Sequence, residues 1–136
     1  MNRFLLLAYQ GAAGISDTLT GALLIASPAF TLRLMHLSVP SDALPYLAFI
    51  GSFVMAVGLC YLYAELLVGR KDCVGRAEAV WLVTAVIRSS VAIFVVSAVL
   101  RGAIPSGWLT VAAFDGACVL IQALGLRKGW LRHAVR

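Results

Sequence analysis

Four long runs of apolar residues make up most of the chain, and short segments that hold most of the charges separate them. The runs cover residues 4–26, 44–68, 77–100 and 108–126. Each is close to or longer than the roughly 20 residues that a helix needs to cross a bilayer. Lipid offers the backbone no hydrogen-bond partners, so each run is expected to be an α-helix. The pattern predicts an all-α protein, a four-helix antiparallel transmembrane bundle in one membrane domain over residues 1–136.

The segment between the first two runs has a helical pattern of its own. Ser27 is suited to the N-cap position of a helix, and Pro28 to its first position. Phe30, Leu34 and Leu37 would then share one face. We therefore expect a short interfacial helix between helices 1 and 2, with an irregular loop as the alternative.

The first run also has some features of a secretory signal peptide, because Arg3 precedes it and small residues follow it. Asp17 interrupts its apolar stretch, however, and the run is long for a signal-peptide core. We therefore interpret residues 4–26 as a retained span.

The composition places the chain outside the soluble class. Hydrophobic residues make up 62% and charged residues 12% of the sequence, against roughly 25% charged residues in a soluble domain. The net charge of +5 could suggest nucleic acid. The basic residues flank the apolar runs, however, without interleaved aromatic residues, which argues against nucleic-acid binding and for the lipid bilayer as partner.

The basic residues also predict an orientation. Alternate crossings place two of them, Arg33 and Arg101, on one side of the bilayer. The other side carries eight: Arg3, Arg70, Lys71, Arg76, Arg127, Lys128, Arg132 and Arg136. Lys and Arg accumulate on the cytoplasmic side of membrane proteins. We therefore expect a multi-pass protein of the inner (plasma) membrane with both termini in the cytoplasm.

Each predicted span carries a stripe of small and polar residues at helical spacing. In chain order the stripes are Gln10, Gly14, Asp17 and Gly21; Gly51, Gly58 and Glu65, with Tyr61 nearby; Trp81, Thr84, Arg88 and Ala92; and Asp115, Cys118 and Gln122. Spacings of three, four and seven keep each set on one helix face. Small residues let helices approach closely and polar ones seek partners, so the stripes predict the inward faces.

Three charged residues of these stripes fall at one depth in the bilayer. Counted from the outer helix ends, Asp17, Arg88 and Asp115 lie within about 5 Å of one another in depth. A lone charge near the bilayer centre costs about 2.5–3.5 kcal/mol or more. Clustering lowers that cost, and we predict that Arg88 bridges Asp17 and Asp115. The cluster can be read as a titrating or ligand-binding pocket, or as a structural pin between helices.

Other side chains of the stripes could extend such a pocket. Gln10 and Gln122 lie at matching depth toward the cytoplasmic side, and a hydrogen bond between them is the interpretation favoured here. Tyr61 and Trp81 are the candidates for holding a headgroup, although Trp81 is also counted among the aromatic residues of the membrane interface. Glu78 is expected to be solvated.

The sequence offers little for metal, redox or hydrolytic chemistry. Its three cysteines form no CxxC, and both histidines lie outside the predicted spans. We therefore expect no disulfide framework, no metal site and no haem held by paired histidines. No nucleophile has an adjacent base, so no catalytic residue is assigned. Quinone is the one cofactor that the polar layer could hold.

The layout resembles that of the small four-helix bacterial membrane proteins called DoxX-like. The resemblance lies in Ser27-Pro28 after the first span, the stretch from Gly51 to Gly58, and the Arg88–Asp115 pairing. It covers most of the chain, but its motifs are short and carry no catalytic residue over. It implies an accessory subunit of a membrane system, in some members a quinone-linked oxidoreductase.

Two other four-helix families fit less well. Small multidrug transporters have an acidic residue in their first helix, as Asp17 is here, but Arg88 departs from their pattern. Proteins similar to vitamin K epoxide reductase need a CxxC, which is missing.

Three functions stay open from the sequence. The first is a non-enzymatic accessory or scaffold component, with another membrane subunit or a second copy of the chain as partner. The second is a small transporter or proton-coupled ligand binder. The third is a quinone- or lipid-binding redox partner.

Overall fold

The computed structural model of the protein describes residues 2–134 and is helical almost throughout, with no strand in that range. Arg136, counted above among the cytoplasmic charges, lies outside the described residues. The elements are α1 (Arg3–Ala26), α2 (Pro28–Leu34), η1 (Ser41–Ala43), α3 (Leu44–Leu67), η2 (Lys71–Cys73), α4 (Val74–Leu100), η3 (Ser106–Trp108), α5 (Leu109–Arg127) and α6 (Trp130–His133). The all-α prediction is confirmed, and α1, α3, α4 and α5 lie where the four long helices were expected.

Three of these helices, each taken with the short 3-10 turn before it, are long and apolar enough to cross a membrane. They cover Ser41–Leu67, Lys71–Leu100 and Ser106–Arg127. At 24 residues, α1 is also long enough. It is less apolar, because Gln10, Asp17 and several small or hydroxyl residues interrupt its hydrophobic side chains. A fourth crossing therefore stays a prediction.

The chain divides into two compact units. The N-terminal unit comprises residues 8–63, and the C-terminal unit comprises residues 2–7 and 64–134. Each unit is described by itself below.

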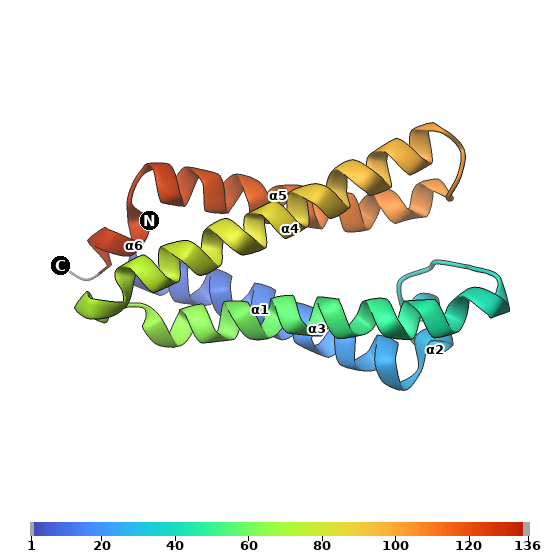
Figure 1. Ribbon diagram of the computed structural model, residues 1–136, viewed down its shortest axis with the longest axis horizontal. Helices are drawn as coiled ribbons and strands as arrows, with labels where there is room; N and C mark the ends of the chain where they lie inside the picture. The colour runs from blue at the N-terminus through green and yellow to red at the C-terminus, as the bar shows by residue number, and fades with distance from the viewer. Residues whose placement is uncertain (1, 135–136) are drawn as a thin grey trace. The chain divides into compact units, whose positions relative to one another are not determined.

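In the N-terminal unit, α1 and α3 run antiparallel and touch through glycines (Figure 1). A Cβ at Gly21 would lie 2.4 Å from the backbone nitrogen of Met55 and 2.5 Å from the carbonyl oxygen of Gly51. A Cβ at Gly58 would lie 2.4 Å from the backbone nitrogen of Thr18. Only glycine permits such close backbone contact, as in other small-residue helix interfaces. The glycine stripes predicted on the first two spans thus face each other.

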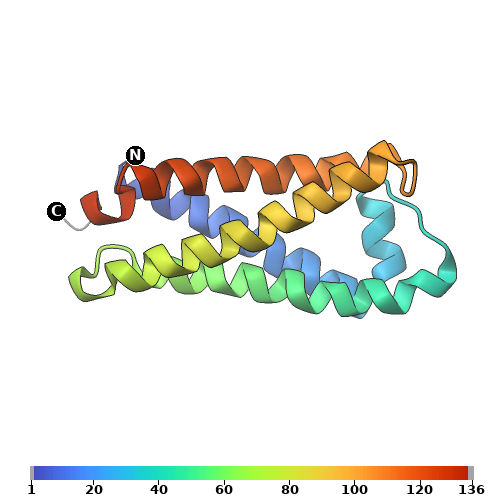
Figure 2. The same cartoon turned by 45° about the horizontal axis from the view of Figure 1, so that its top comes forward.

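The short helix predicted after the first span is present as α2, which runs across the direction of α3 near the start of α3 (Figure 2). Two details differ from the prediction. The Ser27 side chain makes no capping hydrogen bond, and instead the Thr31 hydroxyl donates to the Ser27 carbonyl oxygen at 3.0 Å. Leu37 is buried, whereas Phe30 and Leu34 are exposed, so the three do not share a face.

The predicted face of α2 fails because the helix ends at Leu34. His36 has a φ of 55°, and the Leu37 N–H donates to the Leu32 carbonyl oxygen at 2.9 Å. This left-handed residue and the hydrogen bond across it form a Schellman-type helix end, a position that more often holds glycine. The reversal separates Leu37 from Phe30 and Leu34.

In the C-terminal unit, α4 and α5 form a long antiparallel hairpin (Figure 1). Gly102, with a φ of 69°, ends α4, and the Ala103 N–H donates to the Ala98 carbonyl oxygen at 2.9 Å. At the other end of the hairpin, Gly129 also has a left-handed backbone, with a φ of 62°, and α6 follows it. A left-handed glycine therefore ends each of the two helices, Gly102 after α4 and Gly129 after α5.

Candidate functional site: the polar seam of the α4–α5 hairpin

The buried polar residues of the C-terminal unit lie in one seam between α4 and α5. Positions 81, 84 and 88 share a face of α4, and positions 115, 118, 122 and 125 share a face of α5. Because the helices are antiparallel, the seam has three layers: Trp81 with Gly125, Thr84 with Gln122, and Arg88 with Asp115. We call these three layers the polar seam.

The charged layer is an enclosed ion pair. Arg88 donates from Nη1 to Oδ1 of Asp115, and the two residues are only 3% and 8% exposed. The Phe114 ring lies over the guanidinium, with its centroid 5.2 Å from Cζ, within the range of a cation–π contact. The guanidinium therefore meets a carboxylate and an aromatic face, which offset the cost of removing its charge from water.

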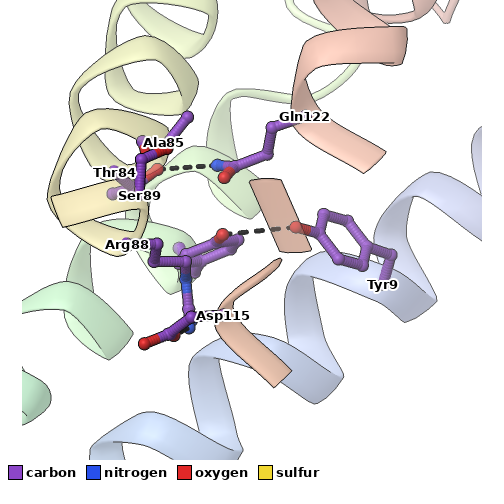
Figure 3. Close-up of polar contacts among 8 residues, drawn as sticks. Tyr9, Thr84, Ala85, Arg88, Ser89, Asp115 and Gln122 are labelled. Carbon is purple, nitrogen blue, oxygen red and sulfur yellow. Dashed lines mark hydrogen bonds and ion pairs between the residues drawn. The ribbon is translucent and has the colours of Figure 1, made fainter. Parts of the chain in front are cut away.

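The middle layer is a hydrogen bond between neutral groups. Gln122 donates from Nε2 to the Thr84 hydroxyl at 2.7 Å (Figure 3). That hydroxyl donates in turn to the Val80 carbonyl oxygen at 2.8 Å. Gln122 is completely buried, yet its Oε1 accepts no hydrogen bond from the described residues. The seam thus contains one buried acceptor without a donor, an arrangement that costs about 1–3 kcal/mol.

The third layer packs an indole against a glycine. A Cβ at Gly125 would lie 2.4 Å from Cζ3 of Trp81 and 2.8 Å from Cε3 of Trp130. Trp81 is fully buried, so its assignment to an interfacial aromatic belt is wrong. The hydropathy pattern could not separate the two roles, because Trp81 stands only seven residues into the helix that begins at Val74.

The remaining candidates from the sequence lie in the N-terminal unit. Asp17, Gln10 and Tyr61 are buried there. The bridge from Arg88 to Asp17 and the hydrogen bond between Gln10 and Gln122 would join the two units, and both stay predictions. Within the C-terminal unit, Gln122 uses its amide hydrogen for Thr84.

One residue of the N-terminal unit escaped the sequence reasoning. The Tyr9 ring meets that of Tyr61 edge-on with centroids 5.9 Å apart, and their hydroxyl oxygens are 3.2 Å apart. Tyr9 lies one position before Gln10, outside the stripe of α1 chosen by its spacing. The sequence signal that could have identified Tyr9 is its hydroxyl group, next to the predicted polar position of Gln10.

An exposed ion pair joins α6 to α4. Arg132 donates from Nε to Oε1 of Glu78 at 2.7 Å and from Nη2 to Oε2 at 2.9 Å. The Glu78 side chain, which the sequence predicts to be solvated, is 21% exposed and is paired with Arg132, whose side chain is 72% exposed. Hydrogen bonding to Glu78 raises the pKa of Arg132. The ion pair forms because Gly129 turns α6 back toward α4. The sequence pattern does not reveal this turn.

No family model, curated protein or solved structure matches this chain. The interpretation therefore rests on the geometry. Among residues 2–134, no group of three or more His, Cys, Asp or Glu side chains is placed to hold a metal ion. The polar seam combines a compensated charge pair, a hydroxyl–amide hydrogen bond and a tightly packed indole.

Proposed function

We propose that this protein is a non-enzymatic accessory or scaffold component of a membrane system, in which the Arg88–Asp115 pair fixes the packing of its helices. The observation that carries the proposal is the mutual compensation of these two buried charges. A guanidinium already bound to a carboxylate and covered by Phe114 is suited to holding α4 against α5. The proposal also includes the resemblance to DoxX-like proteins, some of which are accessory subunits of membrane systems.

The proposed architecture is a bundle of four transmembrane helices, with α1 as the fourth crossing and α2 at the outer interface. The length of α1 and its glycine contacts with the strongly apolar α3 support this arrangement. The exposed Phe30 and Leu34 of α2 are suited to the boundary between headgroups and acyl chains.

The proposed orientation places both termini in the cytoplasm of a cell whose plasma membrane holds the protein. Support comes from the C-terminal unit alone. One end of its α4–α5 hairpin carries Arg70, Lys71, Arg76, Arg127 and Lys128, and the other end carries Arg101. The positive-inside rule assigns the first end to the cytoplasm.

A second candidate function, a small transporter or proton-coupled ligand binder, is favoured by one observation. The buried Oε1 of Gln122 accepts no hydrogen bond from residues 2–134. A ligand with a hydrogen-bond donor would satisfy it. The first function is preferred because the charged layer beside it is already paired.

The two functions are separated by replacing the ion pair with apolar residues of similar size, Arg88→Met with Asp115→Leu. The tagged wild type and the double variant are purified in mild detergent, and the co-purifying proteins and lipid-soluble molecules are identified by mass spectrometry. Ser90→Ala, an exposed change on α4, is the matched control.

The scaffold proposal expects a defined membrane subunit to co-purify equally with the wild type, the control and the folded double variant. Loss of a pH-dependent small ligand from the folded double variant, with no protein partner in any sample, would refute it and favour the binder.

A further inference from the structure

Basic side chains gather at the end of the C-terminal unit where α4 begins and α5 ends. All are exposed: Arg3, Arg70, Lys71, Arg76, Arg127, Lys128 and Arg132. We call these seven residues the basic end. The acidic residues of the same region are Glu65, Asp72 and Glu78. Arg101 is the single basic residue at the opposite end of the hairpin. The positive charge of this unit is therefore concentrated at one end.

Contacts on two sides join the segments that form the basic end. The guanidinium of Arg3 lies against the loop before α4, where a Cβ on Gly69 would be 2.8 Å from Nη2 of Arg3. Gly69 has a φ of 87°, so glycine both allows this turn and leaves room for the arginine. On the other side, the Arg132–Glu78 ion pair and the buried Leu131 hold α6 to the rest of the unit.

The charges of the basic end are not all equally available to an external anion. Arg132 is engaged by both carboxylate oxygens of Glu78. Because Glu78 is paired with Arg132, Glu65 and Asp72 are the acidic residues left in this region to offset the other six basic residues. The Trp130 ring packs over the last turn of α5, near Gly125. Tryptophan beside lysine and arginine, at the end of apolar helices, is typical of the headgroup layer of a bilayer.

We propose that the basic end is a binding surface for the phosphate headgroups of anionic phospholipids, and that Arg132 positions α6 instead of binding lipid. Helices α4 and α5 are long and apolar enough to lie among acyl chains, which brings their ends to headgroup level. Anionic lipids attract exposed basic residues near the membrane surface, and salt weakens that attraction. This inference is independent of the scaffold proposal.

The test measures which lipids surround the purified full chain in nanodiscs of phosphatidylcholine. A trace of dansyl-labelled phosphatidylglycerol or dansyl-labelled phosphatidylcholine is added, and energy transfer from the tryptophans is recorded. Both leaflets have one composition, so the orientation of the protein does not matter. The variant Arg70→Gln, Lys71→Gln, Lys128→Gln removes three charges of the basic end. Arg101→Gln, at the opposite end, is the matched control.

We expect the anionic probe to be preferred by about fivefold or more at low ionic strength, as expected from the attraction of a single basic residue. The preference should be clearly reduced in the triple variant, which keeps Arg3, Arg76 and Arg127, and should disappear in about 1 M salt, where the screening length is about 3 Å. It should survive in Arg101→Gln and in Arg132→Gln. Circular dichroism checks that each variant is folded, and the salt titration of the wild type carries the test if the triple variant is not.

Equal transfer to both probes in the wild type would overturn the proposal. A preference that is undiminished in the folded triple variant, or that Arg101→Gln reduces equally, would also overturn it. Millimolar inorganic phosphate at constant ionic strength should leave the preference unchanged. Its displacement by phosphate would assign the surface to the free anion and so contradict a headgroup site.

Discussion

The strongest prediction concerns the energetic coupling between Arg88 and Asp115. Both residues are nearly inaccessible, at 3% and 8% exposed, and their side chains are hydrogen-bonded to each other. Removing one partner of such a pair leaves an uncompensated buried charge and typically costs about 3–5 kcal/mol. The insertion cost of a lone charge at the bilayer centre, about 2.5–3.5 kcal/mol, gives a similar magnitude.

The two single substitutions are expected to differ. Arg88→Met leaves a carboxylate that can become neutral by taking up a proton, so its cost should lie near 3 kcal/mol. Asp115→Asn leaves a guanidinium that stays charged, so its cost should lie nearer 5 kcal/mol. If Asp17 also binds Arg88, as the sequence predicts, that second carboxylate will lower the cost of Asp115→Asn.

The double variant Arg88→Met, Asp115→Leu tests whether the two charges stabilise each other. Replacing a buried ion pair by well-packed apolar residues is often neutral or stabilising. Arg88→Met with Asp115→Leu should therefore cost far less than the sum of the single changes, a coupling of at least about 3 kcal/mol. The free energy of unfolding is measured in mixed micelles with increasing dodecyl sulfate, followed by circular dichroism. Ser90→Ala, as control, should change it by no more than about 0.5 kcal/mol. Additive effects of the two single changes would refute the pairing argument.

Two further predictions use the same unfolding measurement. Gly21→Ala should destabilise the protein by about 1–3 kcal/mol or more, because its methyl group would lie 2.4 Å from a backbone nitrogen that cannot easily move. Gly116→Ala is the control and should be neutral or slightly stabilising, because nothing lies within 4 Å of its added methyl group. Equal effects of the two changes would contradict the close α1–α3 contact. Gln122→Leu should lower the free energy of unfolding by less than about 1 kcal/mol, because it loses one hydrogen bond but also removes an unpaired buried oxygen. The Thr84 hydroxyl keeps its hydrogen bond to its own helix. A loss above about 2 kcal/mol would show that Oε1 is satisfied in the native protein.

The helices could be predicted from the sequence because each long apolar run has only one stable form in lipid. The run 44–68 begins where α3 begins and ends one residue after it, and the run 108–126 is displaced from α5 by one residue at each end. The apolar run predicts a start at residue 77, whereas α4 begins three residues earlier at Val74, because the charge of Arg76 interrupts the apolar pattern there. A helix begins where its backbone hydrogen bonds begin, and the hydropathy pattern does not reveal that position.

The contacts at helix ends could not be predicted, because they depend on how the chain turns there. The pairing of Glu78 with Arg132 depends on the turn at Gly129, which brings α6 back onto α4. Leu37 looked like part of an apolar face until the left-handed backbone of His36 removed it. Periodicity describes which residues share a face while a helix continues, and it carries no information beyond the residue where the helix ends.

The polar seam explains how a hairpin of two nearly uniformly apolar helices can have one register. In lipid, apolar side chains gain little from facing another helix, so shape and polar pairing must select the contact. Sliding α4 by one turn along α5 would place Arg88 opposite Val111 or Val119 instead of Asp115. The slip would separate the two charges of the pair, and a charge that loses its partner near the bilayer centre costs about 2.5–3.5 kcal/mol or more. A slip that brings Ile121 to the place of Gly125 would also press a side chain against the Trp81 ring, where a Cβ has no room. Pairing and exclusion therefore specify the same register from different layers, so loss of the ion pair should loosen the register without abolishing it.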